Sequence, residues 1–440
     1  MLLALLVWLA RARYRPALPA DQSRTTGEPR VSSGPMEGVK VVEVAQFTYV
    51  PSAGATLADW GATVYKIEHA FTGDAQRGML GYGPAAVVEG TYSPIMEHPN
   101  RGKRSIGLDV GHPEGLRVLH RMVEECDVFL TNFLPEARAR LHIDVEDIRA
   151  VNPQVIYARG SALGHRGPES LKGGFDSASY WARGGGSMGV TPPDLSAKPL
   201  NMPAPAHGDT LGGLTIAGGV AAALFKRATT GEPSVVDVSL LSVGAYACAL
   251  SVDISLLTGD PWVWPPNELP GAPVNPVVGY FETADAKWIY LAMLQPGRYW
   301  ADFCRHIERE DLVDDPRFDT DEKLIANAQE AAFIVQAELL TRPLDEWIEC
   351  FHDLEGQWSV VQDSVQVGHD EQLRAMGYFA PVIDADGKPR ELITNPIQFD
   401  ERPTVTTRAP QFAEHTDEVL AEFGYTEEQI LQLKIEGAAT

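Results

Sequence analysis

The chain has 440 residues, of which 44% are hydrophobic, and this length allows about two or three domains with large cores. Its formal net charge of −24 argues against nucleic acid and anionic membranes as partners, because both would repel an acidic surface. The 4 cysteines are widely spaced without a CxxC pair, and the 11 histidines show no metal-binding spacing. Unpaired cysteines are typical of a reducing compartment, so we expect a cytoplasmic protein.

Residues 1–35 are interpreted as a disordered N-terminal extension. The apolar run MLLALLVWLA at its start is too short to span a bilayer. Arg11 and Arg13 follow this run, whereas the positive charges of a signal peptide precede its apolar segment. Residues 16–35 are rich in Pro, Ser, Thr and Gly, a composition typical of disorder.

Residues 36–257 are predicted to form a large domain in which strands and helices alternate. Short segments rich in β-branched residues predict strands at 40–45, 63–68, 105–110, 127–133 and 154–162. The segments between them read as helices, so the pattern predicts parallel βαβ units and a Rossmann-like α/β fold. From Thr210 to about Leu257 the sequence is predicted to be helical, with a break at 229–233.

The remaining sequence predicts a smaller α+β domain. Residues 258–276 are rich in proline and are interpreted as a linker. Residues 277–379 begin with a predicted hairpin that turns at Ala284–Lys287, and helical segments follow. Residues 380–440 end in two predicted helical segments.

The run GGGSMG at 184–189 matches two familiar patterns, G-x-G-x-x-G of dinucleotide sites and G-x-S-x-G of hydrolases. Both patterns require a helix after the glycines. Pro192 and Pro193 follow instead, so the run is interpreted as a flexible loop beside a site. Ser187 is therefore not expected to be a nucleophile.

The segment 206–225, AHGDTLGGLTIAGGVAAALF, carries a single carboxylate, Asp209, before a series of small apolar residues. This pattern predicts a helix whose N-cap is Asp209, with the carboxylate accepting hydrogen bonds from free helix N–H groups. The helix dipole is expected to keep the carboxylate ionised and to stabilise an oxyanion nearby. From this segment alone, capping is a simpler explanation than catalysis.

A basic cluster in this acidic chain consists of Arg101, Lys103 and Arg104. Such a cluster is either a local anion-binding site or a solvated turn, and the residues alone leave both interpretations open.

Four stretches, together with the segment around Asp209, resemble the family III CoA-transferases and occur in the same order. These stretches are 38–70, 100–141, 229–241 and 408–424. The resemblance implies a Rossmann-like large domain with a parallel sheet, a smaller α+β domain, and a segment 380–440 that returns to the large domain. It also implies an interlocked-ring homodimer, an acyl-CoA donor, a carboxylic acid acceptor, and neither a metal nor a redox cofactor.

The resemblance also assigns roles to individual residues. Asp209, in the pair Gly208–Asp209, falls on the nucleophile of the transferases. The positions that hold coenzyme A in the family correspond to Asn132, Phe133, Arg140 and Leu141. His69 stands where a family member has a CoA-binding arginine, and Arg77 is a nearby substitute. The basic cluster provides further candidates for CoA phosphates, namely Arg101, Lys103 and Arg104.

These assignments predict CoA transfer between carboxylic acids through an aspartyl-CoA thioester on Asp209. Segment 173–185 is similar to transferases that act on bulky or aromatic acids, so we expect such an acceptor. Three tryptophans are candidates for lining its pocket, although core packing explains them equally well: Trp181, Trp262 and Trp264.

Two alternatives remain, a racemase-type isomerase of the same family and a non-catalytic CoA-binding protein. Racemisation requires two proton-transfer groups on opposite faces of the α-carbon. Phe175 and Gln295 stand where the racemase has a histidine and a glutamate, and neither side chain is a suitable acid or base. Asp176 is a candidate substitute base, but the pattern favours the transferase.

Overall fold

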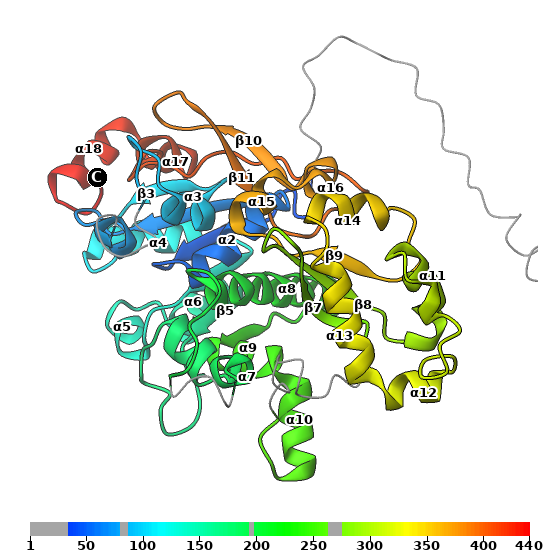
Figure 1. The fold of residues 1–440 in the computed structure, drawn as a ribbon. Helices are drawn as coiled ribbons and strands as arrows, with labels where there is room; N and C mark the ends of the chain where they lie inside the picture. Colours follow the sequence, from blue (N-terminus) through cyan, green and yellow to red (C-terminus); the bar gives the residue numbers. More distant parts are fainter. Residues whose placement is uncertain (1–33, 80–86, 193–197, 263–274) are drawn as a thin grey trace, which may run out of the picture. The chain divides into compact units, whose positions relative to one another are not determined.

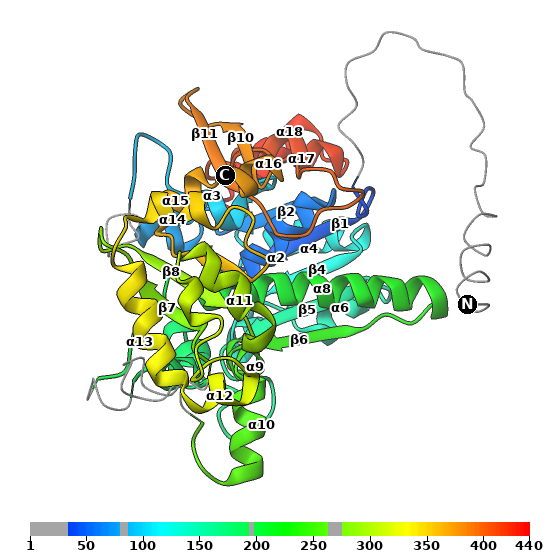
Figure 2. The same cartoon turned by 45° about the vertical axis from the view of Figure 1, so that its right-hand side comes forward.

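The computed structural model describes residues 34–79, 87–192, 198–262 and 275–440 (Figures 1 and 2). A six-stranded parallel sheet has the strand order β3-β2-β1-β4-β5-β6. Its strands are β1 (Lys40–Val44), β2 (Thr63–Glu68), β3 (Arg104–Gly107), β4 (Val128–Thr131), β5 (Ile156–Ser161) and β6 (Val235–Ser239). The predicted α/β class with a parallel sheet is confirmed. The order reverses between β1 and β4, the position where open α/β sheets bind ligands.

The predicted helical region from 210 to 257 is interrupted by β6, which corrects the sequence interpretation. Helix α8 ends at Thr230, and its C-cap is Gly231, whose φ of 76° is left-handed. The chain then enters β6, where Val235 pairs with Tyr157 of β5. Closely spaced valines favour a strand once a sheet edge supplies the hydrogen-bonding partner. The helices of this region are α8 (His207–Thr230), α9 (Leu240–Ala247) and α10 (Ala249–Thr258).

Helices cover both faces of the sheet, so successive residues of its inner strands are buried on both sides, as are all residues of β4. On one face, α2 packs against α8 and buries Val50, Leu57 and Ile216 completely. On the other face, α4 contributes Val118 and Leu119 to a second core. Figure 2 shows α8 running beside β5 and β6. The helices of this region are α2 (Tyr49–Asp59), η1 (Ala75–Met79), α3 (Pro94–Asn100), α4 (Pro113–Glu124), α5 (Pro135–Arg140), α6 (Val145–Val151), η2 (Ser177–Ala182) and α7 (Gly186–Val190).

Judged by length and composition alone, α8 is long and apolar enough to cross a membrane. By the same criterion α9 and α10 together could form one span, with an angle of 72° between the two helices. The packing of α8 gives a different explanation for its composition. Ile216 and Val220 are fully buried between α2 and the sheet. We therefore interpret α8 as a core helix.

The C-terminal residues contact the edge of the parallel sheet. Val419 and Leu433 lie in the same core as α4. The backbone N–H of Thr440 donates to the carbonyl oxygen of Gly107 on β3 at 3.1 Å. The elements of this segment are α15 (Ser364–His369), α16 (Glu371–Ala375), β10 (Phe379–Ile383), β11 (Pro389–Ile393), α17 (Thr416–Glu422) and α18 (Glu427–Ile435).

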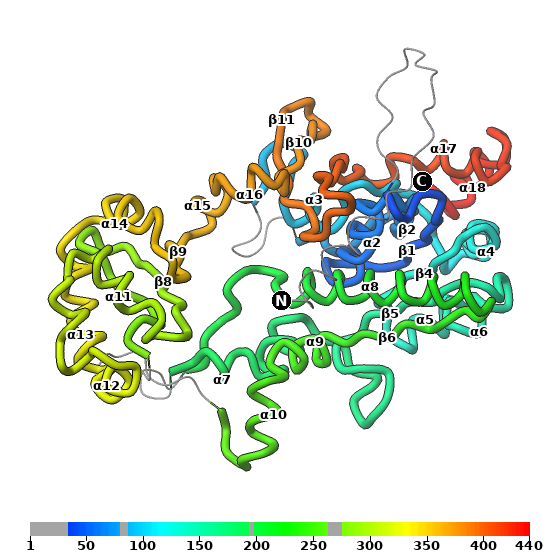
Figure 3. Tube along the Cα trace, turned by 90° about the vertical axis from the view of Figure 1, so that its right-hand side faces the viewer, coloured from blue at the N-terminus to red at the C-terminus, as the bar shows by residue number. Residues whose placement is uncertain are grey.

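Residues 277–360 contribute a separate hydrophobic core around a three-stranded antiparallel sheet. In Figure 3 these residues are the yellow-green to gold part of the chain. The predicted hairpin is present, and Thr283 donates its backbone N–H to Lys287 across the turn at 2.9 Å. Phe303 and Trp347 are fully buried in this core. The elements are β7 (Val278–Glu282), β8 (Trp288–Ala292), α11 (Pro296–His306), η3 (Glu310–Leu312), α12 (Asp321–Ala326), α13 (Ala328–Leu339), α14 (Leu344–Cys350) and β9 (Trp358–Val360).

Candidate active site

Asp209 lies in the first turn of α8, but it is not the N-cap. The helix begins at His207, and the capping position is Ala206, which has a left-handed φ of 56° and no side-chain cap hydrogen bond. The predicted capping role of Asp209 is therefore wrong, because the N-cap lies three residues earlier in the sequence. The Asp209 side chain instead lines a cavity of about 450 Å³ near the carboxyl ends of β4 and β5.

The environment of Asp209 favours its protonated form. Burial, together with the negative charge of Asp176, raises the pKa of Asp209 to about 7. The dipole at a helix N-terminus typically contributes about 0.3–1 kcal/mol, whereas one pKa unit corresponds to about 1.4 kcal/mol. The expectation that the dipole keeps this carboxylate fully ionised is therefore wrong, because loss of hydration outweighs it.

Asp176 is held close to the same helix terminus. Its side chain is buried, and its Oδ2 accepts the backbone N–H of Gly208 at 3.2 Å. The neighbouring Phe175 is 58% exposed and lines the cavity with Asp209. Gln295 is exposed at the start of α11 and is not among the residues that line this cavity. Phe175 carries no acid or base, and Gln295 is not in this cavity lining, so these two positions do not supply the proton-transfer groups that the racemase pattern requires.

A second cavity, of about 570 Å³, lies at the carboxyl ends of β1 to β4. The two cavities share part of their walls, namely Phe47, Asn132, Phe133 and Leu134. Five predicted CoA-contact residues line the second cavity: His69, Asn132, Phe133, Arg140 and Leu141. The structure thus brings this predicted set together, next to the cavity that contains Asp209.

The amide of Asn132 is committed to the protein backbone. Its Oδ1 accepts the N–H of Gln46 at 3.0 Å, and its Nδ2 donates to the carbonyl oxygen of Gln46 at 2.6 Å. Asn132 therefore holds the loop after β1, and one amide N–H and one oxygen lone pair of its side chain remain for a ligand.

The basic cluster is turned toward internal acidic partners. Arg101 pairs with Asp59 at 2.6 Å, and Lys103 pairs with Glu43 at 2.8 Å. Arg104 pairs with two glutamates of α17, Glu418 and Glu422. None of the three lines either cavity. The structure therefore does not bring these predicted residues to the site, because carboxylates distant in sequence neutralise them.

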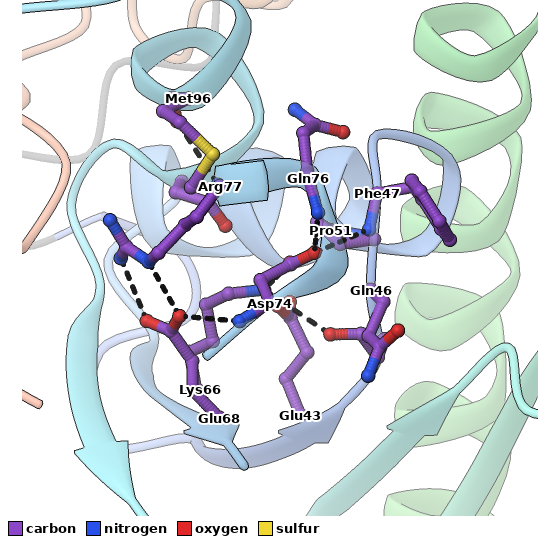
Figure 4. Close-up of polar contacts among 12 residues, drawn as sticks. Glu43, Gln46, Phe47, Pro51, Lys66, Glu68, Asp74, Gln76, Arg77 and Met96 are labelled. Atoms are coloured by element: carbon purple, nitrogen blue, oxygen red, sulfur yellow. Dashed lines mark hydrogen bonds and ion pairs between the residues drawn. The ribbon is translucent and has the colours of Figure 1, made fainter. Parts of the chain in front are cut away.

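A buried ion-pair network supports the loop after β1 (Figure 4). Lys66 pairs with Asp74 at 2.8 Å, and Arg77 pairs with Glu68 at 2.7 Å. Asp74 Oδ1 accepts the backbone N–H of Phe47 at 3.0 Å. Phe47 has a left-handed φ of 65°, which is unusual for a large side chain and is stabilised by this hydrogen bond. The network commits Arg77 to Glu68, so the position of Arg77 does not support its predicted substitution for a CoA-binding arginine.

Two aromatic residues of the cavity walls were not predicted from the sequence. Phe47 lines both cavities, and its ring contacts Phe175 edge to face with centroids 5.5 Å apart. Tyr49, the first residue of α2, lines the cavity with Asp209. The stretch QFTYVPSAG contains both residues, but only the closeness of α2 to α8 brings them to the site.

The glycine run, Trp181 and Trp262 are not among the residues that line either cavity. Residues 186–190 form the short helix α7, so the predicted loop is partly helical and ends before Pro192. Ser187 is buried, and its hydroxyl donates a hydrogen bond to the backbone carbonyl oxygen of Leu200 at 2.8 Å. Trp181 donates its Nε1 proton to the same carbonyl oxygen at 2.8 Å. Trp262 is half-buried, and Trp264 lies outside the described residues.

Comparison with known proteins gives a consistent assignment. The sequence profile described as CoA-transferase family III matches residues 36–416. The (R)-2-hydroxy-4-methylpentanoate CoA-transferase of Clostridioides difficile is 32% identical, over 91% of this chain and 98% of the relative. The cinnamoyl-CoA:phenyllactate CoA-transferase of Clostridium sporogenes is 31% identical, over 90% of this chain and 95% of the relative.

A solved structure supports the same conclusion. The crystal structure of a CAIB/BAIF family protein from Brucella suis superimposes with a TM-score of 0.73 at 27% identity, covering 89% of this chain and 100% of that one. The family profile spans most of the chain, including both cavities and Asp209. The chain therefore belongs to CoA-transferase family III, whose transferases move coenzyme A from an acyl-CoA to a carboxylic acid.

Proposed function

We propose that this enzyme transfers CoA through a covalent aspartyl-CoA thioester on Asp209. The observation that carries the proposal is the position of the Asp209 carboxylate in a cavity that shares a wall with a second, larger cavity. The second cavity has room and partners for the nucleotide end of CoA. The first one holds the reacting groups.

The reaction divides into four exchanges at carbonyl carbons. A carboxylate oxygen of Asp209 attacks the donor thioester, which releases CoA thiolate and leaves a mixed anhydride. The thiolate attacks the aspartyl carbonyl, releasing the donor acid and forming the aspartyl-CoA thioester. The acceptor carboxylate then attacks this thioester, forming a second anhydride and releasing CoA thiolate. That thiolate attacks the acceptor acyl carbon, so acyl-CoA leaves and Asp209 is restored.

The electrostatics of Asp209 suit this role. A pKa of about 7 leaves a substantial fraction of the carboxylate ionised at neutral pH. A partly desolvated carboxylate is more reactive than one fully surrounded by water. The walls that limit water around it also protect the anhydride from hydrolysis.

The second cavity is proposed to bind the nucleotide end of CoA. Arg140 supplies a cation for phosphate, Phe133 an aromatic surface for adenine, and Leu141 an apolar contact. His69 lines the same cavity at the position of the family arginine. Asn132 contributes by fixing the loop that separates the two cavities. The three paired cations Arg101, Lys103 and Arg104 are left out of this proposal.

We infer a bulky, largely apolar acyl group as the substrate class. Apolar side chains line the cavity around Asp209: Phe47, Leu134, Phe175 and Leu240. Two of the similar transferases are named for branched or aromatic hydroxy acids, 2-hydroxy-4-methylpentanoate and phenyllactate. Branched and aromatic 2-hydroxy acids are therefore the first acceptors to test.

We also propose a homodimer with the interlocked arrangement of the family. Several large apolar side chains of α8 to α10 are more than 70% exposed in the single chain: Phe225, Tyr246, Leu250, Leu256 and Leu257. Exposed apolar surface of this extent is typical of a protein interface, and a second copy is the proposed partner. Sedimentation at nanomolar concentration should show a dimer, and a folded, active monomer would contradict the proposal.

We also propose the predicted domain division and a cytoplasmic location for this chain. The predicted division into 36–257, 277–379 and a returning segment 380–440 is supported by the separate core of residues 277–360. Contacts of the C-terminal helices with the core of the large domain support the return of segment 380–440 to that domain.

A cytoplasmic location is supported by the free thiols of all 4 cysteines.

Trapping of the intermediate tests the covalent mechanism. The enzyme is incubated with an acyl-CoA and then with hydroxylamine, which converts an aspartyl thioester to a hydroxamate. Mass spectrometry of peptides should place the modification on Asp209, and an Asp209→Ala variant should be inactive and unmodified. Full transferase activity in that variant would refute the nucleophile. A non-catalytic CoA-binding protein would show no turnover in either form.

A further inference from the structure

Tyr49 is a buried tyrosine at the active site with an unsatisfied hydroxyl group. Its side chain is only 5% exposed, and it lines the same cavity as Asp209. The hydroxyl has no hydrogen-bond partner among the described residues. Burying a hydroxyl without a partner is unfavourable, so such a group in a reaction cavity indicates a partner that arrives with the substrate.

The backbone around Tyr49 is shaped to hold its ring. A Cβ atom on Gly160 of β5 would lie 2.7 Å from Cε1 of the ring. A Cβ atom on Gly212 of α8 would lie 2.4 Å from Cε2 on the opposite edge. Any side chain at either position would collide with the ring. The two glycines therefore allow a strand and a helix to hold the phenol from both sides and to fix the direction of its hydroxyl.

The charge near this hydroxyl keeps it a hydrogen-bond donor. Burial, together with the negative charge of Asp209, raises the pKa of Tyr49 far above its usual range. The phenol therefore stays protonated at neutral pH. Each step at the aspartyl or acyl carbonyl group places negative charge on a carbonyl oxygen. A neutral, preorganised donor is suited to stabilise that charge.

We propose that the Tyr49 hydroxyl donates a hydrogen bond to the carbonyl oxygen that becomes negatively charged at Asp209. This role rests on the proposed aspartyl mechanism. No proton is transferred: the O–H bond stays intact while the oxyanion forms and collapses, and CoA thiolate or carboxylate leaves as described above. In this proposal the acceptor belongs to the reacting groups, which is why none of the described residues accepts a hydrogen bond from the Tyr49 hydroxyl.

The variant Tyr49→Phe isolates this role, because it removes the hydroxyl and keeps the ring between the two glycines. Loss of one oxyanion donor typically reduces kcat by about 100-fold or more, and we expect a fall of about that size. KM for acyl-CoA should change less than about twofold, since the contact strengthens in the transition state. The melting temperature should stay the same or rise, because an unsatisfied buried group is removed.

Tyr157→Phe is the matched control on β5. Tyr157 is fully buried, but its hydroxyl donates to the carbonyl oxygen of Ile143 at 2.9 Å, and it lines neither cavity. This variant should lose stability and keep its kcat. The two tyrosines are thus expected to respond in opposite ways to the same chemical change.

Hydroxylamine trapping separates failure of this inference from failure of the covalent mechanism. If the wild-type enzyme forms no hydroxamate on Asp209, the covalent mechanism is refuted and this role falls with it. If the hydroxamate forms but Tyr49→Phe keeps a wild-type kcat, only the inference about Tyr49 is refuted. A rise in KM alone, or a loss confined to 2-hydroxyacyl substrates, would also overturn it, because the hydroxyl would then recognise the substrate and not the oxyanion.

Discussion

Replacement of Asp209 by asparagine should make the protein more stable, by an amount that depends on pH. The pKa of Asp209 is raised from 3.8 to about 7 by burial and by the charge of Asp176. Between about pH 4 and pH 7, Asp209 keeps its proton in the folded state, whereas the same carboxyl group in the unfolded chain has released it. The stability of the wild-type protein therefore falls as pH rises from about 4 to about 7. The neutral asparagine variant lacks this loss.

The size of the effect follows from the pKa shift. A shift of about three units at about 1.4 kcal/mol per unit sets a ceiling of about 4 kcal/mol in favour of Asp209→Asn above pH 8. Contact of the side chain with the cavity reduces this value, because water there screens the charge. Toward pH 4 the stability difference between the two proteins should vanish.

Urea unfolding of both proteins at fixed concentration, in steps from pH 5 to pH 8.5, measures the difference. Glu68→Gln is a control of opposite sign. Despite burial, hydrogen bonds from Arg77 and the charge of Lys66 hold the pKa of Glu68 at about 2. Its stabilising contribution is complete above about pH 5, so this variant should be less stable by a constant amount. An Asp209→Asn gain that is equal at pH 5 and pH 8, or a loss at pH 8, would refute the reasoning.

Three further predictions concern the same cavity. Asp176→Asn keeps an acceptor for the N–H of Gly208 but removes a negative charge near Asp209. The pKa of Asp209 should fall, so the acidic limb of the profile of kcat/KM against pH should move to lower pH. An unmoved limb would contradict this coupling. Gly160→Ala places a methyl group 2.7 Å from the Tyr49 ring, so we expect a loss of about 1–3 kcal/mol in unfolding free energy and a lower kcat. Wild-type stability and kcat together would argue against the tight fit. A 2-methylacyl-CoA incubated in deuterated buffer without acceptor should retain its α-hydrogen by NMR, and rapid exchange would favour the racemase alternative.

The sequence by itself determined the features that depend on local pattern. Alternating β-branched and helical segments predicted β1 to β5, and the hairpin of β7 and β8 followed from two strand-like runs around a turn. The resemblance in ordered motifs singled out Asp209 and five further residues that line two adjacent cavities, and their roles in catalysis and CoA binding stay predictions. The strand and hairpin predictions succeeded because periodicity is a property of the chain alone.

Only the tertiary structure decided the features that join distant parts of the chain. Strand β6 needed an available edge on β5, so its valines did not distinguish it from the helices on either side. The cations of the basic cluster pair with carboxylates that are up to 318 residues away in the sequence, as Arg104 does with Glu422. Because of this pairing they do not line the cavities proposed to bind the ligand. The pKa of Asp209 depends on burial and on Asp176, 33 positions earlier in the sequence. Tyr49 reaches the cavity because glycines on β5 and α8 leave room for its ring, a fit that exists only when three separate elements are packed together.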